Sequence, residues 1–539
     1  MSGATYEWDA VSQTVIKALA PAVEAVNQFS FIGEATHFVK TPNMDAQLLP
    51  TASSLGMDVM LFKYTISLFL VYPLALTLYY LPGKGLKHLF SFVVGFLMVQ
   101  WIFGPDWIHT FITSLATYLM TRIIPGKSMP VIVFIVIVSY MVLAHGYKMY
   151  TSYLSGIFDF TGTQMVLTMK LTSYAWNIYD GIHDRKKVFA ENADPKDRVL
   201  ASRRKYAIKK YPNIIEFFGY IYCFTCILAG PAFEYSDYAA AIDDSAFEVP
   251  DAGKKDDNAA DKKKRVVKRP LTLIAGLTRL LMGVVCMVLY LKVTPLYKLT
   301  TLYDKEFIAT HSFLERLAHL LLSMFGERQK YYFAWKVAEG ASILAGFGFE
   351  GYTADASKTP GFGGVENIDI IGFETATNIA TATRVWNKRT QGWLERYTYQ
   401  RTNRSLIITY LVSALWHGLY PGFFCVFLSM PLVTEVERLI RAKINPLFIP
   451  SYDPKDPKSY PSTPAGLFYK FICWIGSILT MNYVAQTFSM GSLERSLTAL
   501  GSLHYCGHIA FAVSYVLLSL LPTPRSGSKK SAEKTKAQQ

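Results

Sequence analysis

Apolar residues in this chain gather in long runs that polar, charged segments separate. A run such as 129–148, MPVIVFIVIVSYMVLAHGYK, has the length of a helix that crosses a bilayer. Runs of this kind recur along the chain, so we expect an all-α fold, a polytopic transmembrane helical bundle with roughly eleven spans. The expected spans are 59–81, 86–104, 107–124, 129–148, a weaker 157–179, 214–230, 271–291, 307–325, 331–349, 405–434, 466–490 and 498–521.

Two of the polar segments are rich in lysine and arginine. Basic residues outnumber acidic ones in loop 181–213, and the basic half of loop 237–269 adjoins an apolar run. By the positive-inside rule we place both loops in the cytoplasm. The predicted organisation is a membrane-associated N-terminal segment 1–58, a transmembrane domain 59–521 that carries the two loops, and a disordered basic tail 522–539.

Composition supports a membrane protein. The chain of 539 residues is 51% hydrophobic and 17% charged, whereas soluble domains are about one quarter charged. The net charge of +14 is spread over the segments between apolar runs, which favours cytoplasmic loops over binding to nucleic acid. The six cysteines lie in or beside apolar runs and show no disulfide spacing. Cys223 and Cys226 spell C-x-x-C, but they lie inside an apolar run and no second pair completes a zinc site.

The run 405–434 is the most unusual because it contains no Asp, Glu, Lys or Arg but does contain His417. An ionisable side chain at membrane depth is costly, which makes it a candidate for function. Gly418, Pro421 and Gly422 follow and predict a break in the helix. Broken backbone at that depth is tolerated where it faces protein or a watery cavity. We expect a buried cavity with His417 in its wall; the alternative is a hydrogen-bonded packing histidine.

Just upstream, segment 384–404 holds six basic residues against one acidic residue, with aromatic residues between them. Such a segment is either an interfacial anchor or an anion site, for example for the phosphates of a nucleotide-like substrate. Asn387 lies in it, thirty positions before His417. On one straight helix the two would be about 45 Å apart, so they meet only if the chain folds back. His145 is a second histidine in an apolar run, with no motif around it.

The stretches WNKRTQGWLERYTYQR and SALWHGLYPGFFCVF resemble the membrane-bound O-acyltransferase family, which pairs an upstream polar residue with a histidine in a hydrophobic helix. GPAFEY at 230–235 and KYYFAWKVAEGA at 330–341 resemble its lysophospholipid acyltransferase branch, and especially the broad-specificity fungal members. The family patterns WHGxxxGYxxxF, YxxxxF and Tyr-x-x-His match Trp416, His417, Gly418, Gly422 and Phe427 (with Phe423 in place of tyrosine), Tyr483 and Phe488, and Tyr505 and His508.

The resemblance implies a multi-pass enzyme of the endoplasmic reticulum membrane. It would move an acyl group from acyl-CoA to the hydroxyl of a lysophospholipid such as lysophosphatidylcholine, lysophosphatidylethanolamine or lysophosphatidic acid. His417 is the expected base, and Asn387 is expected to bind the thioester oxygen or to orient a substrate. The expected substrate-binding residues are Trp386, Lys388, Arg389, Arg396, Trp416 and Tyr420.

Several alternatives stay open. The acceptor could instead be a sterol, a diacylglycerol or a protein, and a non-enzymatic lipid transporter could use His417 for proton coupling. We expect acyl-CoA as a co-substrate, membrane lipids as neighbours, and no cofactor, metal ion or nucleic acid. The sequence leaves the oligomeric state open.

Overall fold

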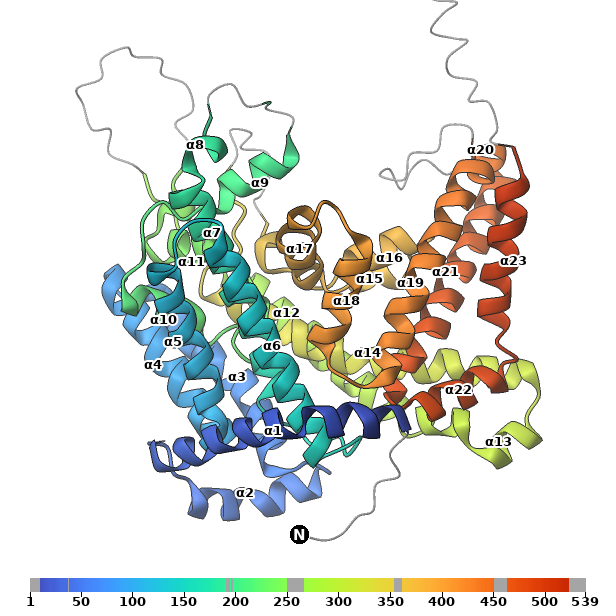
Figure 1. Cartoon of the computed structure of the whole chain (residues 1–539), viewed down its shortest axis with the longest axis horizontal. Coiled ribbons are helices and arrows are strands. Elements are labelled where there is room, and N and C mark those ends of the chain that lie inside the picture. Colours follow the sequence, from blue (N-terminus) through green and yellow to red (C-terminus); the bar gives the residue numbers. More distant parts are fainter. Residues whose placement is uncertain are drawn as a thin grey trace, which may run out of the picture. The chain divides into compact units, whose positions relative to one another are not determined.

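The structure is a computed structural model that describes residues 10–36, 38–190, 194, 197–249, 266–352, 361–449 and 463–522. The middle of the predicted loop 237–269 and nearly all of the predicted tail lie outside the described residues. Regular structure in the described part is helical apart from one isolated bridge between Glu248 and Val267, which confirms the all-α prediction (Figure 1).

The chain divides into two units. The first comprises Met1–Leu291, Arg328–Ile368 and Asn387–Leu419, and the second comprises Lys292–Glu327, Asp369–Trp386 and Tyr420–Gln539. Helix α14, Phe313–Leu344, contributes its first part to the second unit and the rest to the first.

The other helices of the first unit are α1 (Ala10–Thr36), α2 (Pro42–Ser54), α3 (Val59–Tyr80), α4 (Lys84–Phe103), α5 (Trp107–Ile123), α6 (Ser128–Thr151), α7 (Thr161–Ile178), α8 (Arg185–Val188), α9 (Arg198–Tyr206), α10 (Ile214–Ile221), α11 (Tyr235–Ile242), most of α12 (Leu273–Val293), α17 (Lys388–Tyr397) and α18 (Leu406–His417). Those of the second are α13 (Lys305–Thr310), α15 (Ile370–Glu374), α16 (Ile379–Val385), α19 (Pro421–Lys443), α20 (Asn445–Phe448), α21 (Pro464–Met490), α22 (Leu493–Ser502) and α23 (Cys506–Leu520).

The predicted number of about eleven spans is not reproduced in the described residues. Five stretches are long and apolar enough to cross a membrane, and a sixth arises if α22 and α23, which are bent by 74°, form one span. The predicted span 214–230 contains only the eight-residue helix α10, far short of the roughly 20 residues a crossing needs. The run 405–434 is divided between α18 and α19. An apolar run in this chain is therefore not always one straight crossing.

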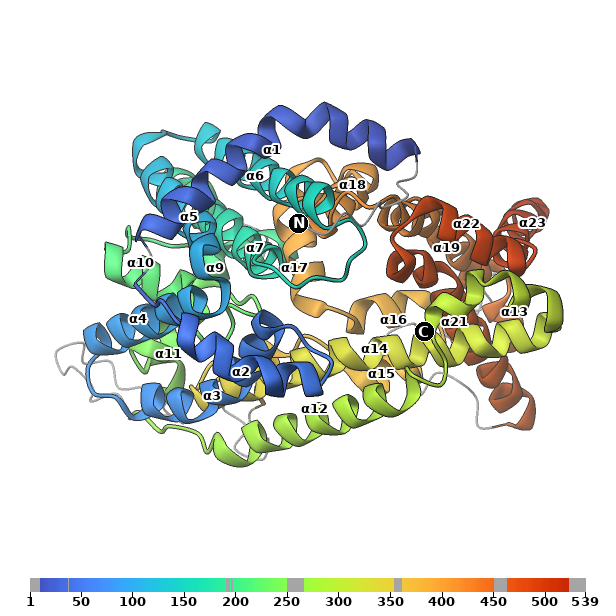
Figure 2. The same ribbon diagram turned by 90° about the horizontal axis from the view of Figure 1, so that it is seen from below.

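Helix α7 is the centre of the first unit, with α5, α6, α10 and α17 in contact with it (Figure 2). Almost all of its side chains are buried, although several are polar. Lys170 Nζ donates to the carbonyls of Tyr220 at 2.5 Å and Ile221 at 3.2 Å. Thr172 Oγ1 accepts a bond of 2.9 Å from Trp393 Nε1. Because buried polar groups need partners, these bonds fix how the surrounding segments sit on α7.

Helix α1 lies across α5 and α6 (Figures 1 and 2). Ser30 Oγ on α1 donates to Asp106 Oδ1 at 2.8 Å and lies 2.9 Å from His109 Nε2 on α5. The other ring nitrogen of His109 lies 2.8 Å from the hydroxyl of Tyr140 on α6. This polar cluster ties the N-terminal helix to the bundle.

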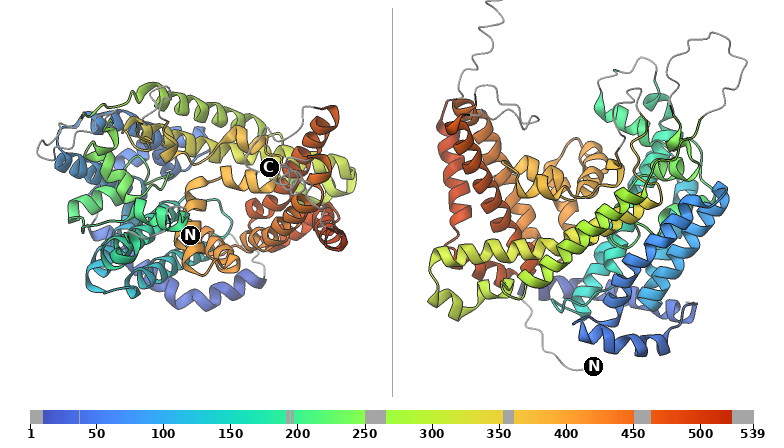
Figure 3. Two further views of the ribbon diagram at one scale, coloured as in Figure 1. Left: turned by 90° about the horizontal axis from the view of Figure 1, so that it is seen from above. Right: turned by 180° about the vertical axis from the view of Figure 1, so that it is seen from behind.

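The second half of α14 runs antiparallel to α12, and glycines let the two helices approach closely (Figure 3). A Cβ added at Gly276 would lie 2.7 Å from the Leu344 side chain, and one added at Gly283 would lie 2.7 Å from the side chain of Val337. Any larger residue would force the helices apart. This close packing of α12 and α14 supports the part of α14 that carries the buried charged residues Lys336 and Glu339.

In the second unit, α19, α21 and α23 contact one another. Phe423 on α19 stacks on Phe488 of α21 with ring centroids 4.3 Å apart. The His508 ring on α23 lies between the hydroxyls of Tyr483, 2.9 Å from Nδ1, and Ser429, 3.2 Å from Nε2. Motif residues far apart in the sequence therefore meet in this unit.

Candidate functional site

His417 is the last residue of α18. Ser405 caps the start of this helix, where its side chain accepts from the Ile408 amide at 3.3 Å. The helix ends before Gly418, which adopts a φ of 133°, a conformation that essentially only glycine reaches. The predicted break after His417 is therefore confirmed. The imidazole is partly buried and lies edge-on to the neighbouring Trp416 ring, with centroids 4.6 Å apart.

Asn387 stands immediately before α17 in the left-handed conformation, with φ 45° and ψ 51°. Asparagine tolerates this conformation better than most residues with a side chain. The Thr390 hydroxyl donates to Asn387 Oδ1 at 2.9 Å. That bond engages the amide oxygen, and it leaves the amide N–H groups as the donors that can serve a substrate.

Helices α17 and α18 pack on the same part of α7. From α18, Trp416 Nε1 donates to the carbonyl of Met165 at 3.0 Å. From α17, Thr390 Oγ1 lies 3.4 Å from Met169 Sδ. The two α7 residues are one helical turn apart, about 6 Å along the axis. The residues that precede His417 and follow Asn387 are thus attached to adjacent turns of one helix.

Tryptophan rings join the two helices directly. Trp393 of α17 and Trp416 of α18 have ring centroids 6.2 Å apart, within the range of favourable aromatic pairs. Both belong to a buried cluster with Met141, Met169, Trp176 and Tyr397. The chain therefore folds back between Asn387 and His417, as a site made from both residues requires.

A buried ion pair on α14 anchors the segment that faces the start of α17. Lys336 Nζ lies 2.7 Å from Glu339 Oε2, and both side chains are 1% exposed. Glu339 Oε1 accepts from the backbone amides of Asn367 at 2.6 Å and Ile368 at 3.2 Å. A buried carboxylate with these partners is well satisfied, so it fixes the backbone at 367 and 368.

Asn367 in turn holds the residues that follow Asn387. Its carbonyl accepts from the Lys388 amide at 2.8 Å, and its side-chain oxygen accepts from the Arg389 amide at 3.1 Å. The left-handed turn at Asn387 is therefore held through Asn367 by the buried ion pair of α14.

The predicted basic residues have partners within the protein. Lys388 pairs with Glu366, and Arg396 Nη2 lies 2.8 Å from Glu234 Oε1. Arg389 is different because its guanidinium donates to two backbone carbonyls, that of Glu366 at 3.2 Å among them, and no described carboxylate lies within ion-pair distance of it. Burial lowers the pKa of Arg389. Of these three side chains, Arg389 is the one with no carboxylate of the described residues within ion-pair distance.

The remaining predicted residues, Trp386 and Tyr420, belong to the second unit. The Trp386 ring lies 4.9 Å from that of Phe373, and the Tyr420 ring lies 5.6 Å from that of Phe423. In the first unit, α17, which follows Asn387, and α18, which ends at His417, contact each other. Over the part of the chain that the structure describes, no group of three or more His, Cys, Asp or Glu residues could hold a metal ion.

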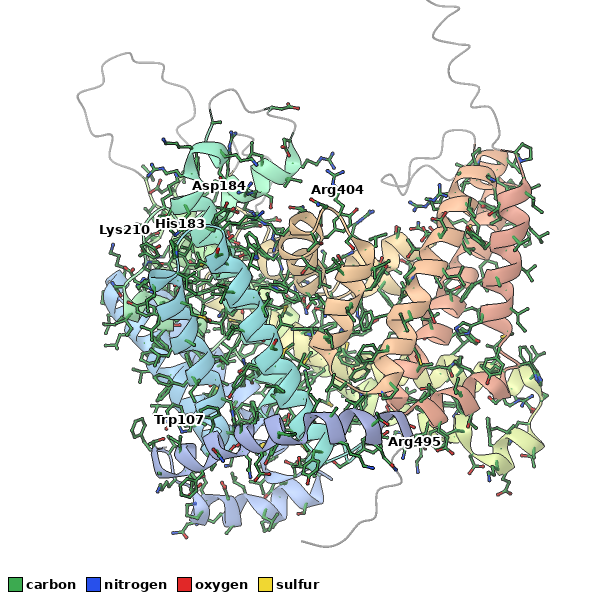
Figure 4. The ribbon with its side chains drawn as sticks, viewed as in Figure 1. Trp107, His183, Asp184, Lys210, Arg404 and Arg495 are labelled. Carbon is green, nitrogen blue, oxygen red and sulfur yellow. The ribbon has the colours of Figure 1, made fainter. Side chains whose placement is uncertain are left out.

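The segment after α17 lies at the same end of the first unit as loop 181–213. Asp180 Oδ2 pairs with Arg401 at 2.5 Å, and its other oxygen pairs with Arg203 at 2.7 Å. These ion pairs hold the two segments together at one end of the first unit. In Figure 4 this end carries His183, Asp184, Lys210 and Arg404, and the opposite end carries Trp107.

Sequence reasoning gave no role to several residues that shape the site. Thr390, Glu339 and Asn367 hold Asn387 in place, and His145 bonds to the Trp416 carbonyl at 3.1 Å. Each acts on a partner that the sequence alone does not identify. His145 and Glu339 were visible as ionisable residues in predicted spans, and Thr390 and Asn367 carried no such signal.

Comparison with known proteins gives a consistent result. A model of the membrane-bound O-acyltransferase family matches residues 147–486. The chain is 30% identical to the "Lysophospholipid acyltransferase" of Schizosaccharomyces pombe, with 87% of each chain covered. It is 29% identical to the "Lysophospholipid acyltransferase" of Saccharomyces cerevisiae, over 88% of this chain and 76% of that one. It is also 29% identical to the human "Membrane-bound glycerophospholipid O-acyltransferase 2", over 83% and 80% respectively.

Proposed function

The chain belongs to the membrane-bound O-acyltransferase family, and from that premise we propose that it is an acyl-CoA-dependent lysophospholipid acyltransferase. The enzyme acylates the free hydroxyl of a lysophospholipid. The observation that supports the site assignment is the attachment of α17 and α18 to adjacent turns of α7, through Thr390, three residues after Asn387, and Trp416, next to His417. Similar chains named for this activity support the acceptor class.

His417 acts as the general base. A hydroxyl is a poor nucleophile at neutral pH, and a neutral imidazole can take its proton as attack begins. The hydroxyl oxygen attacks the thioester carbon of acyl-CoA, so the ester C–O bond forms and the C–S bond breaks. The proton passes from the imidazolium to the sulfur, and CoA leaves as the free thiol.

Asn387 supplies a hydrogen-bond donor to the thioester oxygen as negative charge develops there. The bond from Thr390 engages the amide oxygen, so the N–H groups are the donors that serve the thioester. A donor that is fixed before the reaction stabilises the transition state without reorganising. In this mechanism the acyl group passes directly between the two substrates and no acyl-enzyme forms.

Arg389 meets a phosphate of acyl-CoA. Its guanidinium already has neutral carbonyl partners and no carboxylate among the described residues, so an added phosphate would complete an ion pair. The enzyme resides in the endoplasmic reticulum membrane, with the end that carries loop 181–213 and Arg404 facing the cytoplasm. Acyl-CoA would then reach Arg389 from that side.

The test uses the purified full-length protein in detergent or nanodiscs, with oleoyl-CoA and single acceptors. We expect release of the CoA thiol only when a lysophospholipid is present, with the diacyl product seen by mass spectrometry. Preparations of H417A run in parallel control for contaminating activity. Transfer to a sterol or diacylglycerol but to no lysophospholipid would contradict the proposal, as would lipid movement without CoA release.

Arg389→Gln tests the phosphate contact. We expect a KM for acyl-CoA several-fold above that of the wild type, with the KM for lysophospholipid little changed. Added salt should raise the acyl-CoA KM of the wild type more than that of the variant, because the variant has lost the charge that salt screens. Lys388→Gln, whose lysine is already paired with Glu366, serves as the matched control. An equal effect in both variants would contradict the assignment of Arg389.

A further inference from the structure

His145 lies on α6, which contacts α18 in the first unit. Its side chain is almost fully buried, and Nε2 lies 3.1 Å from the carbonyl oxygen of Trp416. A carbonyl oxygen only accepts hydrogen bonds, so Nε2 carries the hydrogen and donates it. The contact therefore fixes one tautomer of the neutral ring, with the hydrogen on Nε2.

The carbonyl that receives this bond belongs to the peptide group joining Trp416 to His417. It lies in the last turn of α18, where carbonyls have no helical N–H partner ahead of them. The chain leaves the helix at Gly418, which adopts a φ of 133°. His145 thus supplies, from a neighbouring helix, the donor that a continued helix would have supplied from its own backbone.

Trp416 is held on its other side as well. Its indole nitrogen donates to the Met165 carbonyl on α7 at 3.0 Å, and its ring packs beside Trp393. The residue before His417 is therefore fixed by α6 through its backbone and by α7 through its side chain. Two helices together set the direction in which the next Cα–Cβ bond points.

We propose that His145 is a positioning residue: by donating to the Trp416 carbonyl, it fixes the backbone from which the His417 imidazole reaches the acceptor hydroxyl. This inference rests on the proposed function, because positioning matters only if His417 takes a proton. It differs from a packing role, since packing alone predicts less folded protein and an unchanged turnover number per folded molecule.

The experiment compares three substitutions in the purified full-length protein. His145→Gln keeps an N–H donor near the position of Nε2, whereas His145→Leu and His145→Met fill similar space without a donor. We expect kcat to fall roughly tenfold to a hundredfold in the Leu and Met variants, the scale of a small misplacement of a catalytic group. The KM values for oleoyl-CoA and lysophosphatidylcholine should stay near those of the wild type, and the Gln variant should recover most of kcat.

His109→Leu is the matched control, because His109 is a buried histidine of the same unit whose partners are Ser30 and Tyr140. We expect its kcat per folded molecule to equal that of the wild type. Wild-type kcat in the Leu and Met variants would overturn the proposal. So would a Gln variant as slow as they are, a change confined to KM, or failure of the donor-less variants to fold. An inactive wild type would instead contradict the proposed function, and it is seen before any variant is compared.

Discussion

The two halves of the site are held by different forces. Around Asn387 the fixing contacts are polar and directional, from the buried pair of Lys336 and Glu339 through Asn367 to the start of α17. Around His417 the contacts are mostly ring packing, with Trp416 inside a cluster of aromatic and methionine side chains. Removing one member of a buried polar network leaves its partner unpaired and strongly destabilises the fold. Trimming an aromatic cluster lowers stability in proportion to the buried apolar area that is lost. The two halves should therefore respond differently to substitution.

His417→Ala gives the largest expected effect and sets the scale. Loss of a general base should lower kcat by about 10²-fold to 10⁴-fold. Protein abundance and the melting temperature should change little, because the residue is partly exposed at the end of a helix. The measurement is acyl transfer at saturating substrates beside a thermal unfolding curve. Activity above about one tenth of the wild-type value would conflict with the role of a base.

Glu339→Gln tests the polar contacts that fix the backbone around Asn387. It leaves the Lys336 ammonium buried without its carboxylate, which costs about 3–5 kcal/mol when a buried pair is broken. We expect a large drop in the melting temperature and loss of activity as the turn at Asn387 loses its anchor. Glu435→Gln is the control, because its partner Arg438 is 59% exposed and exposed pairs contribute little to stability. Equal shifts for the two variants would show that the buried network does not hold the fold.

Asn387→Ala should cost about 10²-fold in kcat, the scale of one lost oxyanion donor. Combined with His417→Ala it should be little worse than His417→Ala alone, because residues that act on one reacting centre are not additive. The left-handed backbone adds strain of about 1–2 kcal/mol for alanine. Asn387→Gly removes the amide without that strain. If Asn387→Gly retains wild-type activity, the amide has no part in catalysis.

Trp393→Phe tests the ring packing around Trp416 and should have the smallest effect on stability and activity. It removes the indole bond to Thr172 and part of the contact with Trp416, which should cost about 1 kcal/mol of stability. We expect kcat within a few-fold of the wild-type value. A loss of stability larger than that of Glu339→Gln would reverse the comparison between the two halves.

The sequence identified the parts of the site that carry local signals. His417 was visible as a histidine in an apolar run, and Gly418 and Pro421 marked the break that the structure shows. The helical class followed in the same way from the apolar runs. The number of spans could not be derived from the apolar runs, because hydropathy does not distinguish a helix that crosses the membrane from a short buried helix such as α10.

The ion-pair partners of the basic residues could not be predicted from the sequence, for a different reason. Arg396 pairs with Glu234 at a separation of 162 residues, and Lys388 pairs with Glu366 in a loop that no local pattern ties to α17. A segment rich in charge looks the same whether its charges face a ligand or the protein interior. The structure adds that Lys388 and Arg396 each have a carboxylate partner within the protein.

The polar character of α7 has a consequence for the order of biosynthesis. Trp393, the partner of Thr172, follows it by 221 residues in the chain. At about 5–20 residues per second, a ribosome needs on the order of ten to forty seconds to make that intervening length. During this interval Thr172 lacks its hydrogen bond from the Trp393 indole, and α17 does not yet cover α7. Nascent chains halted before residue 388 should therefore keep α7 open to membrane chaperones, and synthesis of α17 should end that exposure.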